Sequence, residues 1–210
     1  MARFFVDRII PPAVTLPPEE SKHAARVLRL STGDRVTVFD AVEAWSGEID
    51  ALGPPVRVRL LERLPRPSLP RVVVAAAVPK GARLDWMVEK LAELGVAAFQ
   101  PVRFARSVAE LGEGKGRRLE KIALAAAKQS GAPVMAIAAP IDVAALPADA
   151  WLASPGATAS FAPGAATVVI GPEGGLTREE EARFVRRASL GASILRIETA
   201  AVVAAARCLA

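Results

Sequence analysis

The chain has 210 residues, of which 52% are hydrophobic and 23% charged, a composition typical of folded globular domains. No run of about twenty apolar residues occurs, so we expect no contact with a membrane, and the first ten residues lack the apolar stretch of a signal peptide. One cysteine excludes an internal disulfide and favours the cytoplasm, and one histidine argues against a bound metal. The net charge of +5, carried mostly by arginine, favours a polyanionic partner such as nucleic acid, although it also serves solubility.

The first segment, residues 1–64, alternates apolar and polar residues in short runs separated by Gly and Pro. Such runs predict antiparallel strands at 35–41, 44–52 and 56–64, and their close spacing favours a small β-barrel. Residues 21–30 predict a helix, with Ala24, Val27 and Leu28 on its apolar side.

Three prolines in residues 65–71 predict a stiff linker, which divides the chain into domains 1–67 and 70–210. Beyond it, apolar runs alternate with amphipathic stretches, a pattern that predicts an α/β domain with a parallel sheet. The predicted strands are 72–78, 96–102, 134–140, 151–154, 167–172 and 193–197, and the predicted helices are 82–95, 116–131, 177–191 and a terminal helix from about Thr199.

The stretch VVIGPEGGLTREE, residues 168–180, combines a β-branched run, a glycine loop and a helix start. Thr177 and Glu180 have the spacing of a capping box. The loop lacks the Lys-Ser/Thr of a phosphate-binding loop and the spacing of a dinucleotide fingerprint. A carboxylate, Glu173, would also repel a phosphate. The glycines therefore favour a ligand with cationic or hydrogen-donating groups, the alternative being a plain strand-to-helix turn.

A second loop, in LGASILRIETA (residues 190–200), has Arg196, Glu198 and Thr199 where the terminal helix is predicted to begin. Ligands of open α/β sheets collect at the carboxyl ends of the strands, so we expect both loops to meet at one site. Arg196 and Glu198 are equally compatible with an ordinary salt bridge.

These blocks, with KGARLDWMVEKLAELGV (80–96) and HAARVLRL (23–30), closely resemble the bacterial methyltransferases that make N3-methyluridine in 16S ribosomal RNA. The resemblance covers nearly the whole chain. It implies a PUA-like β-barrel, a SPOUT α/β domain with a C-terminal trefoil knot, S-adenosyl-L-methionine as cofactor, and a homodimer acting on the small ribosomal subunit. Carried over residue by residue, it implies cofactor contacts at Ile170, Gly171, Pro172, Glu173, Gly174, Gly175, Leu190, Gly191, Ile194, Leu195, Thr199 and Ala200.

Uridine N3 carries a proton that must leave or be shared during methyl transfer. Glu173 and Glu198 are the candidate proton acceptors, and Arg196 is the candidate stabiliser of developing negative charge. Contacts with RNA phosphates are expected from cations of both domains: Arg3, His23, Arg26, Arg29, Lys80, Arg83 and Arg106.

The chain departs from the family pattern at Ala132 and Ser193, where arginines are usual, and at Ala136 and Ile197. These departures leave open a non-catalytic RNA- or ribosome-binding protein on a decayed SPOUT scaffold. A SPOUT enzyme methylating transfer-RNA ribose is a further alternative, although the predicted barrel domain argues against it. A nucleotide hydrolase is disfavoured because the chain has no phosphate loop.

Overall fold

The computed structural model describes residues 1–66, 69–112, 114–161 and 166–210, and these divide into two compact units, Met1–Ser68 and Leu69–Ala210. The predicted linker, 65–71, lies partly outside the described residues, at 67–68.

The first unit is built on a five-stranded sheet in the order β1-β3-β4-β5-β2. The three predicted strands are confirmed as β3 (Arg35–Phe39), β4 (Ala44–Ala51) and β5 (Arg57–Leu64), which pair antiparallel. Sequence reasoning missed β1 (Ala2–Phe5), which pairs parallel to β3, and β2 (Ala13–Thr15). Both are too short to show the alternation that identifies a strand.

The helix predicted over 21–30 is wrong in its bounds and in its apolar face. A short helix α1 (Pro18–Lys22) runs into a π-helical turn, His23–Val27, closed by Leu28 N donating to His23 O at 3.0 Å. A π turn spaces its hydrogen bonds five residues apart, so the 3.6-residue periodicity no longer decides which side chains face the core. Only Ala24 of the predicted stripe is buried, and Val27 and Leu28 are exposed.

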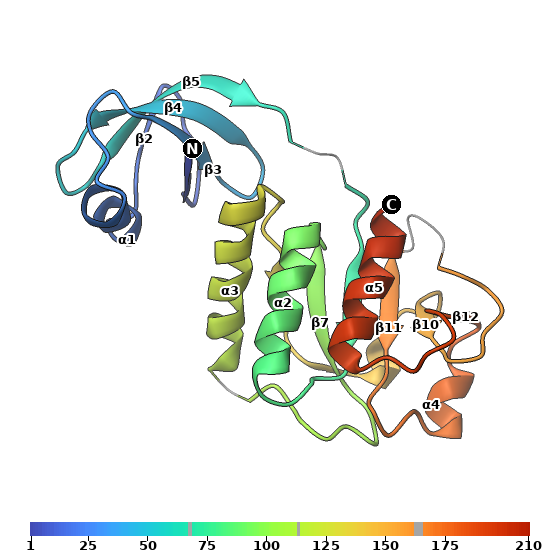
Figure 1. The fold of residues 1–210 in the computed structure, drawn as a ribbon. Helices are drawn as coiled ribbons and strands as arrows, with labels where there is room; N and C mark the ends of the chain where they lie inside the picture. The colour runs from blue at the N-terminus through green and yellow to red at the C-terminus, as the bar shows by residue number, and fades with distance from the viewer. Residues whose placement is uncertain (67–68, 113, 162–165) are drawn as a thin grey trace. The chain divides into compact units, whose positions relative to one another are not determined.

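The second unit contains a sheet in the order β12-β10-β11-β6-β7-β8, in which the paired strands of the described residues all run parallel (Figure 1). The predicted α/β class is therefore confirmed. The strands are β6 (Val73–Ala76), β7 (Ala98–Arg103), β8 (Ala136–Ile137), β10 (Trp151–Ala153), β11 (Thr167–Ile170) and β12 (Arg186–Ala188), with β9 (Ile141–Asp142) beside β7 and a 3-10 turn at Val143–Ala145.

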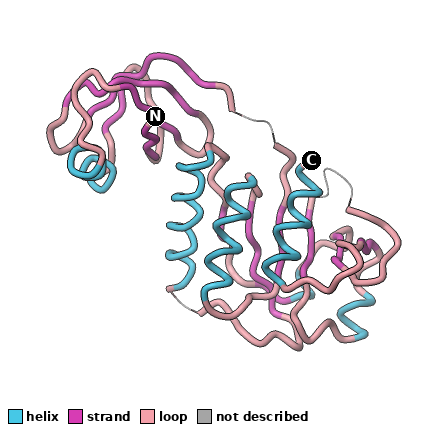
Figure 2. Tube along the Cα trace, in the orientation of Figure 1, coloured by secondary structure: helices cyan, strands magenta, loops and turns pink. Residues whose placement is uncertain are grey.

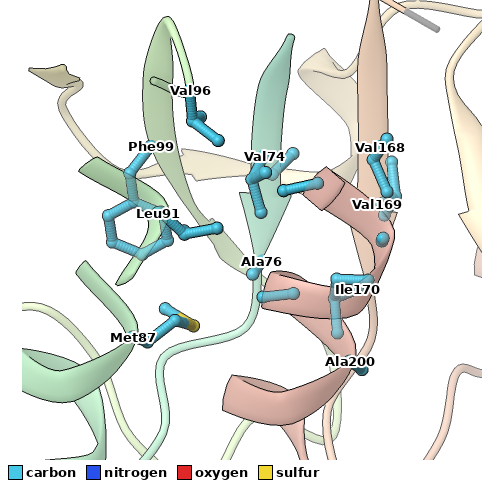
Figure 3. Close-up of a cluster of buried hydrophobic side chains, with 14 of the residues drawn as sticks. Val74, Ala76, Met87, Leu91, Val96, Phe99, Val168, Val169, Ile170 and Ala200 are labelled. Atoms are coloured by element: carbon cyan, nitrogen blue, oxygen red, sulfur yellow. The ribbon is translucent and has the colours of Figure 1, made fainter. Parts of the chain in front are cut away.

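Three long helices lie side by side over one face of this sheet: α2 (Ala82–Leu94), α3 (Lys115–Ser130) and α5 (Ile197–Leu209) (Figures 1 and 2). Leu84, Met87, Val88 and Leu91 of α2 are buried, and Gly95, with φ +83°, ends the helix in the left-handed conformation that suits glycine. Met87 and Leu91 of α2 lie in one apolar cluster with Val74, Phe99 and Ile170 of the strands (Figure 3). This packing fixes the start of α2 near the carboxyl ends of the central strands.

Two predictions near the C-terminus are wrong. The helix expected over 177–191 is a short α4 (Arg178–Ala182) followed by the edge strand β12. The strand expected over 193–197 is absent from the described residues, where 190–196 form a loop and α5 begins at Ile197. Apolar runs this short do not distinguish a strand from a loop that enters a helix.

Candidate active site

A pocket of about 460 Å³ lies at the carboxyl ends of β10 and β11, where parallel α/β sheets bind their ligands. Its lining draws on the glycine loop, defined here as residues 171–176, and on the second loop, residues 190–196. Apart from Glu181 of α4, the rest of the lining is apolar or small and comes from the strand ends and from α5. The lining residues outside the two loops are Leu152, Ala153, Ser154, Pro155, Ile170, Glu181, Ile197 and Ala200.

The glycine loop needs its glycines for space and for backbone conformation. A Cβ on Gly171 would collide with the Leu176 side chain, which also lines the pocket. Gly175 has φ +71°, a conformation that side chains with a Cβ rarely adopt. These residues expose backbone groups to the pocket, so a flat ligand can approach the main chain closely.

The glycine loop is braced from behind by neighbouring segments. Arg106 Nη1 donates to Gly174 O at 3.0 Å. The predicted capping box at the start of α4 is confirmed, with Glu180 Oε2 accepting from Thr177 N at 2.9 Å. Glu180 is buried and its other oxygen accepts from Ala105 N at 2.7 Å. The loop is therefore held in place before any ligand arrives.

The second loop is held mainly at its beginning. Arg207 of α5 donates to Ser189 O at 2.9 Å and to Leu190 O at 3.2 Å. Leu190 and Leu195 pack against the core, whereas Ile194 lines the pocket with a residue exposure of 87%. A large apolar side chain this exposed beside a pocket is available to cover a ligand.

Two carboxylates and one guanidinium meet beside the pocket. Arg83 Nη1, in the first turn of α2, lies 3.1 Å from Glu173 Oε1 and 3.9 Å from Glu198 Oε1. The Glu173 side chain is 43% exposed and lines the pocket, while that of Glu198, in the first turn of α5, is 9% exposed. Glu198 Oε2 is buried and has no hydrogen-bond partner among the described residues. The sequence thus placed Glu173 and Glu198 together correctly, but it assigned the arginine that joins them, Arg83, to contacts with RNA phosphates.

A family model described as RNA methyltransferase domain matches residues 66–209, and another, described as RNA methyltransferase PUA domain, matches residues 16–55. The chain belongs to this RNA methyltransferase family.

Curated members of the family support the same assignment. The chain is 32% identical to ribosomal RNA small subunit methyltransferase E of Synechocystis, over 96% of this chain and 74% of the relative. It is 30% identical to the Mycobacterium tuberculosis protein of the same name, over 89% and 82%. The resemblance identified from the motifs is confirmed.

A solved structure of ribosomal RNA small subunit methyltransferase E from Neisseria gonorrhoeae, bound to S-adenosyl methionine, aligns with a TM-score of 0.86 and 27% identity. The alignment covers 98% of this chain and 95% of that one. A putative methyltransferase from Legionella pneumophila, in complex with the same cofactor, gives 0.82 and 25%, with coverage of 97% and 95%. The predicted PUA-like and SPOUT architecture is confirmed at the level of fold class, and the trefoil knot stays a prediction.

Most residues that the family motifs implied for the cofactor line the pocket. Gly174 and Thr199 lie outside the lining. Sequence reasoning missed the wall at 152–155, although the predicted strand over 151–154 ends there, and it also missed Leu176, Glu181, Ser193 and Ile197. Of the predicted catalytic residues, Arg196 is exposed at the start of α5 and lies outside the lining.

The predicted RNA contacts fall into two groups. His23, Arg26 and Arg29 are exposed around the π-helical turn, and Lys80 is exposed after β6. Arg26 also lines a groove of about 1100 Å³ in the first unit, with Arg8 and Lys22. The remaining residues have partners within the chain: Arg3 lies over the Phe39 ring, Arg83 faces Glu173, and Arg106 holds the glycine loop.

Arg3 occupies an unusual environment for a cation. Its guanidinium carbon lies 5.1 Å from the Phe39 ring centroid, within the range of a cation–π interaction. Burial, and then the charge of Arg66, lower the pKa of Arg3 from its ordinary value. An anion bound here would relieve the repulsion between the two guanidinium groups.

At the positions that depart from the family pattern, Ala132 is buried and Ser193 is an exposed residue of the pocket lining. Among the described residues, no group of three or more His, Cys, Asp or Glu side chains is arranged to hold a metal ion. None of the helices in the described part of the chain has the length and apolarity to cross a membrane.

Proposed function

We propose that this protein transfers a methyl group from S-adenosyl-L-methionine to N3 of one uridine in 16S ribosomal RNA. The observation that carries the proposal is the pocket between the two loops, with an exposed carboxylate, Glu173, in its lining. The names of the curated relatives support ribosomal RNA as the substrate, and the two cofactor-bound structures support the methyl donor.

The residues present fit this cofactor. The pocket volume lies in the range of roughly 300–1,000 Å³ that small-molecule sites occupy. Apolar side chains and glycine backbone suit an adenine ring, and the Glu173 carboxylate suits a sulfonium cation. The binding residues we assign are Ile170, Gly171, Pro172, Glu173, Gly175, Leu190, Gly191, Ile194, Leu195 and Ala200, with Gly174 and Thr199 acting from behind the lining.

When bound, S-adenosyl-L-methionine supplies an electrophilic methyl group and leaves as a neutral thioether. The chain's own residues hold the uridine so that N3 faces this methyl, which replaces diffusional encounter by fixed geometry. The N3–H bond breaks as the N3–C bond forms, and the proton passes to a carboxylate, for which Glu173 and Glu198 are the candidates. Arg196 is the candidate cation for the negative charge that develops on the uracil ring.

Ribosomal RNA would be held by phosphate contacts from the exposed basic residues of both units, in the cytoplasm and within the small ribosomal subunit. Arg8 and Lys22 join Arg26 on the groove of the first unit, and that groove offers an apolar floor as well as charge. As the family resemblance implies, we propose that the protein acts as a homodimer.

Mass spectrometry of 16S ribosomal RNA tests the function directly. RNA from a strain lacking the gene should lack a single N3-methyluridine, and the intact gene should restore it. A gene carrying Glu173→Gln should restore much less, because the substituted amide cannot accept the proton. An unchanged modification map in the deletion strain would overturn the proposal.

Calorimetry with S-adenosyl-L-methionine separates this enzyme from the alternative of a non-catalytic RNA-binding protein. The enzyme should bind the cofactor, with saturable heat at one site per chain. Absence of binding would favour the alternative, which the family departures at Ala132 and Ser193 keep open.

A further inference from the structure

The cluster of Arg83, Glu173 and Glu198 joins three segments that are far apart in the sequence. Arg83 lies in the first turn of α2, Glu173 in the glycine loop after β11, and Glu198 in the first turn of α5. One nitrogen, Arg83 Nη1, faces an oxygen of each carboxylate, at 3.1 Å from Glu173 and 3.9 Å from Glu198.

The two carboxylates differ in what can reach them. The Glu198 side chain is 9% exposed, its Oε2 is fully enclosed, and the residue does not line the pocket. The Glu173 side chain is 43% exposed and does line the pocket. A base entering beside the pocket would therefore reach Glu173 without any rearrangement, whereas Glu198 Oε2 is closed to it.

Burial of Glu198 also explains why Arg83 lies where it does. A buried carboxylate is costly without a compensating cation, and Arg83 is the cation within 4 Å of it among the described residues. Glu198 thus attracts the guanidinium electrostatically, across a distance of 3.9 Å that is too long for a hydrogen bond. An exposed ion pair between Arg83 and Glu173 alone would be weak and poorly defined.

We propose, on the basis of the function proposed above, that Arg83 is a positioning residue for methyl transfer. Anchored by buried Glu198, Arg83 fixes the exposed Glu173 carboxylate at the edge of the pocket, where Glu173 accepts the N3 proton. Glu198 acts through Arg83 and does not take the proton itself. This role differs from the phosphate contact that the sequence suggested for Arg83.

The first test is Arg83→Met, assayed by methylation of small-subunit particles at saturating cofactor. We expect kcat to fall about 100-fold, since a displacement of about 1 Å in a reacting group has an effect of that order. The KM for the particle and the calorimetric affinity for the cofactor should stay within about two-fold, and Arg83→Lys should recover part of kcat because it restores a cation. A melting curve checks the fold of each variant.

Lys90→Met is the matched control. Lys90 lies on the same helix and also contacts two carboxylates, Glu89 and Glu93, at 2.7 and 2.8 Å, but its partners do not line the pocket. The methylation activity of Lys90→Met should equal that of the unmodified chain. The salt dependence of particle binding tests the other role, a phosphate contact by Arg83. Loss of such a contact would weaken binding of the particle and lower the slope of log affinity against log salt concentration by about one. That result for Arg83→Met, with kcat unchanged, would overturn the positioning role.

A double-mutant cycle decides between the two carboxylates. Glu198→Gln should lower kcat in the original chain but have little further effect in the Arg83→Met background, because both changes break the same anchor. If Glu198 were the proton acceptor, its replacement would reduce kcat strongly in both backgrounds, and the proposal would be wrong. The double variant also removes the buried carboxylate that Arg83→Met leaves unpaired, so folding does not limit the test.

Failure of the positioning role can be told from failure of the function. An unmodified chain that methylates no uridine on the particle contradicts the proposed function. An unmodified chain that is active, beside an Arg83→Met variant that keeps at least half of kcat, contradicts only the role of Arg83.

Discussion

The two loops that line the pocket are held very differently. The glycine loop is fixed by the Arg106 side chain, by the capping box of α4 and by the buried Glu180 carboxylate. The second loop is fixed at its beginning by Arg207, and its tip presents Ile194 to solvent.

The difference indicates how binding is divided between the walls. A braced wall offers its backbone groups to a ligand at little entropic cost, because the chain is ordered beforehand. A loosely held wall must be ordered on binding, which lowers affinity but lets the pocket open and close. We therefore expect substitutions in the glycine loop to lower cofactor affinity by straining its backbone. Substitutions in the second loop should change cofactor affinity by altering how the loop closes over the cofactor.

Among substitutions in the two loops, the largest effect on cofactor affinity is expected from Gly175→Val. A β-branched residue at φ +71° costs about 1–2 kcal/mol or more, and the change would distort the backbone that meets the cofactor. Cofactor affinity should fall about ten-fold or more by calorimetry. Gly33→Val is the matched control, since Gly33 also has a positive φ, +92°, but lies in the other unit. Equal loss of cofactor affinity in both variants would contradict a local role for the glycine loop.

A smaller effect is expected from Ile194→Ala in the second loop. The side chain is exposed in the free protein, so the melting temperature should not change. If the loop closes over the cofactor, the lost apolar contact should lower affinity by about 1 kcal/mol, or about five-fold. Val185→Ala provides the comparison, because Val185 is 89% exposed and does not line the pocket. Unchanged affinity in Ile194→Ala would mean that the loop does not close.

The same contrast explains what the sequence could predict. The glycine loop was located correctly because a β-branched run precedes it and a capping box follows it, and both signals lie within a few residues. The second loop was mistaken for a strand because Ile194, Leu195 and Ile197 form an apolar run. In the structure Ile194 lies exposed at the rim of the pocket, Leu195 packs against the core, and Ile197 begins α5.

The arginine of the site was beyond local reasoning. Arg83 is 90 residues from Glu173 in the sequence, so only the folded sheet brings α2 to the glycine loop. As a lone cation at a predicted helix start, Arg83 was expected to contact RNA phosphates and not a carboxylate of the pocket. Long-range pairing of this kind follows from topology, which periodicity indicates only in outline.

The smallest effect is expected from Arg207→Met, which removes the two hydrogen bonds that hold the beginning of the second loop. These bonds are exposed, so stability should fall by about 1 kcal/mol or less. Hydrogen exchange should nevertheless speed up at residues 190–196. We expect this loosening to be confined to the loop, with α5, which carries Arg207, remaining packed.

The only cysteine of the chain reports on that question. Cys208 is fully buried on α5, and burial raises the pKa of its thiol to about 11. Because the thiolate is the reactive form, alkylation by iodoacetamide at pH 8 should be slow, and it should stay slow in Arg207→Met if α5 remains packed. A folded-state pKa above the ordinary value of 9.0 means that the folded chain holds this proton more tightly. The contribution of Cys208 to stability is therefore complete below about pH 9 and lost as the pH rises toward 11, a loss that Cys208→Ala should not show. Fast labelling of Arg207→Met at pH 8 would mean that the second loop and α5 open as one unit, which would contradict loosening confined to the loop.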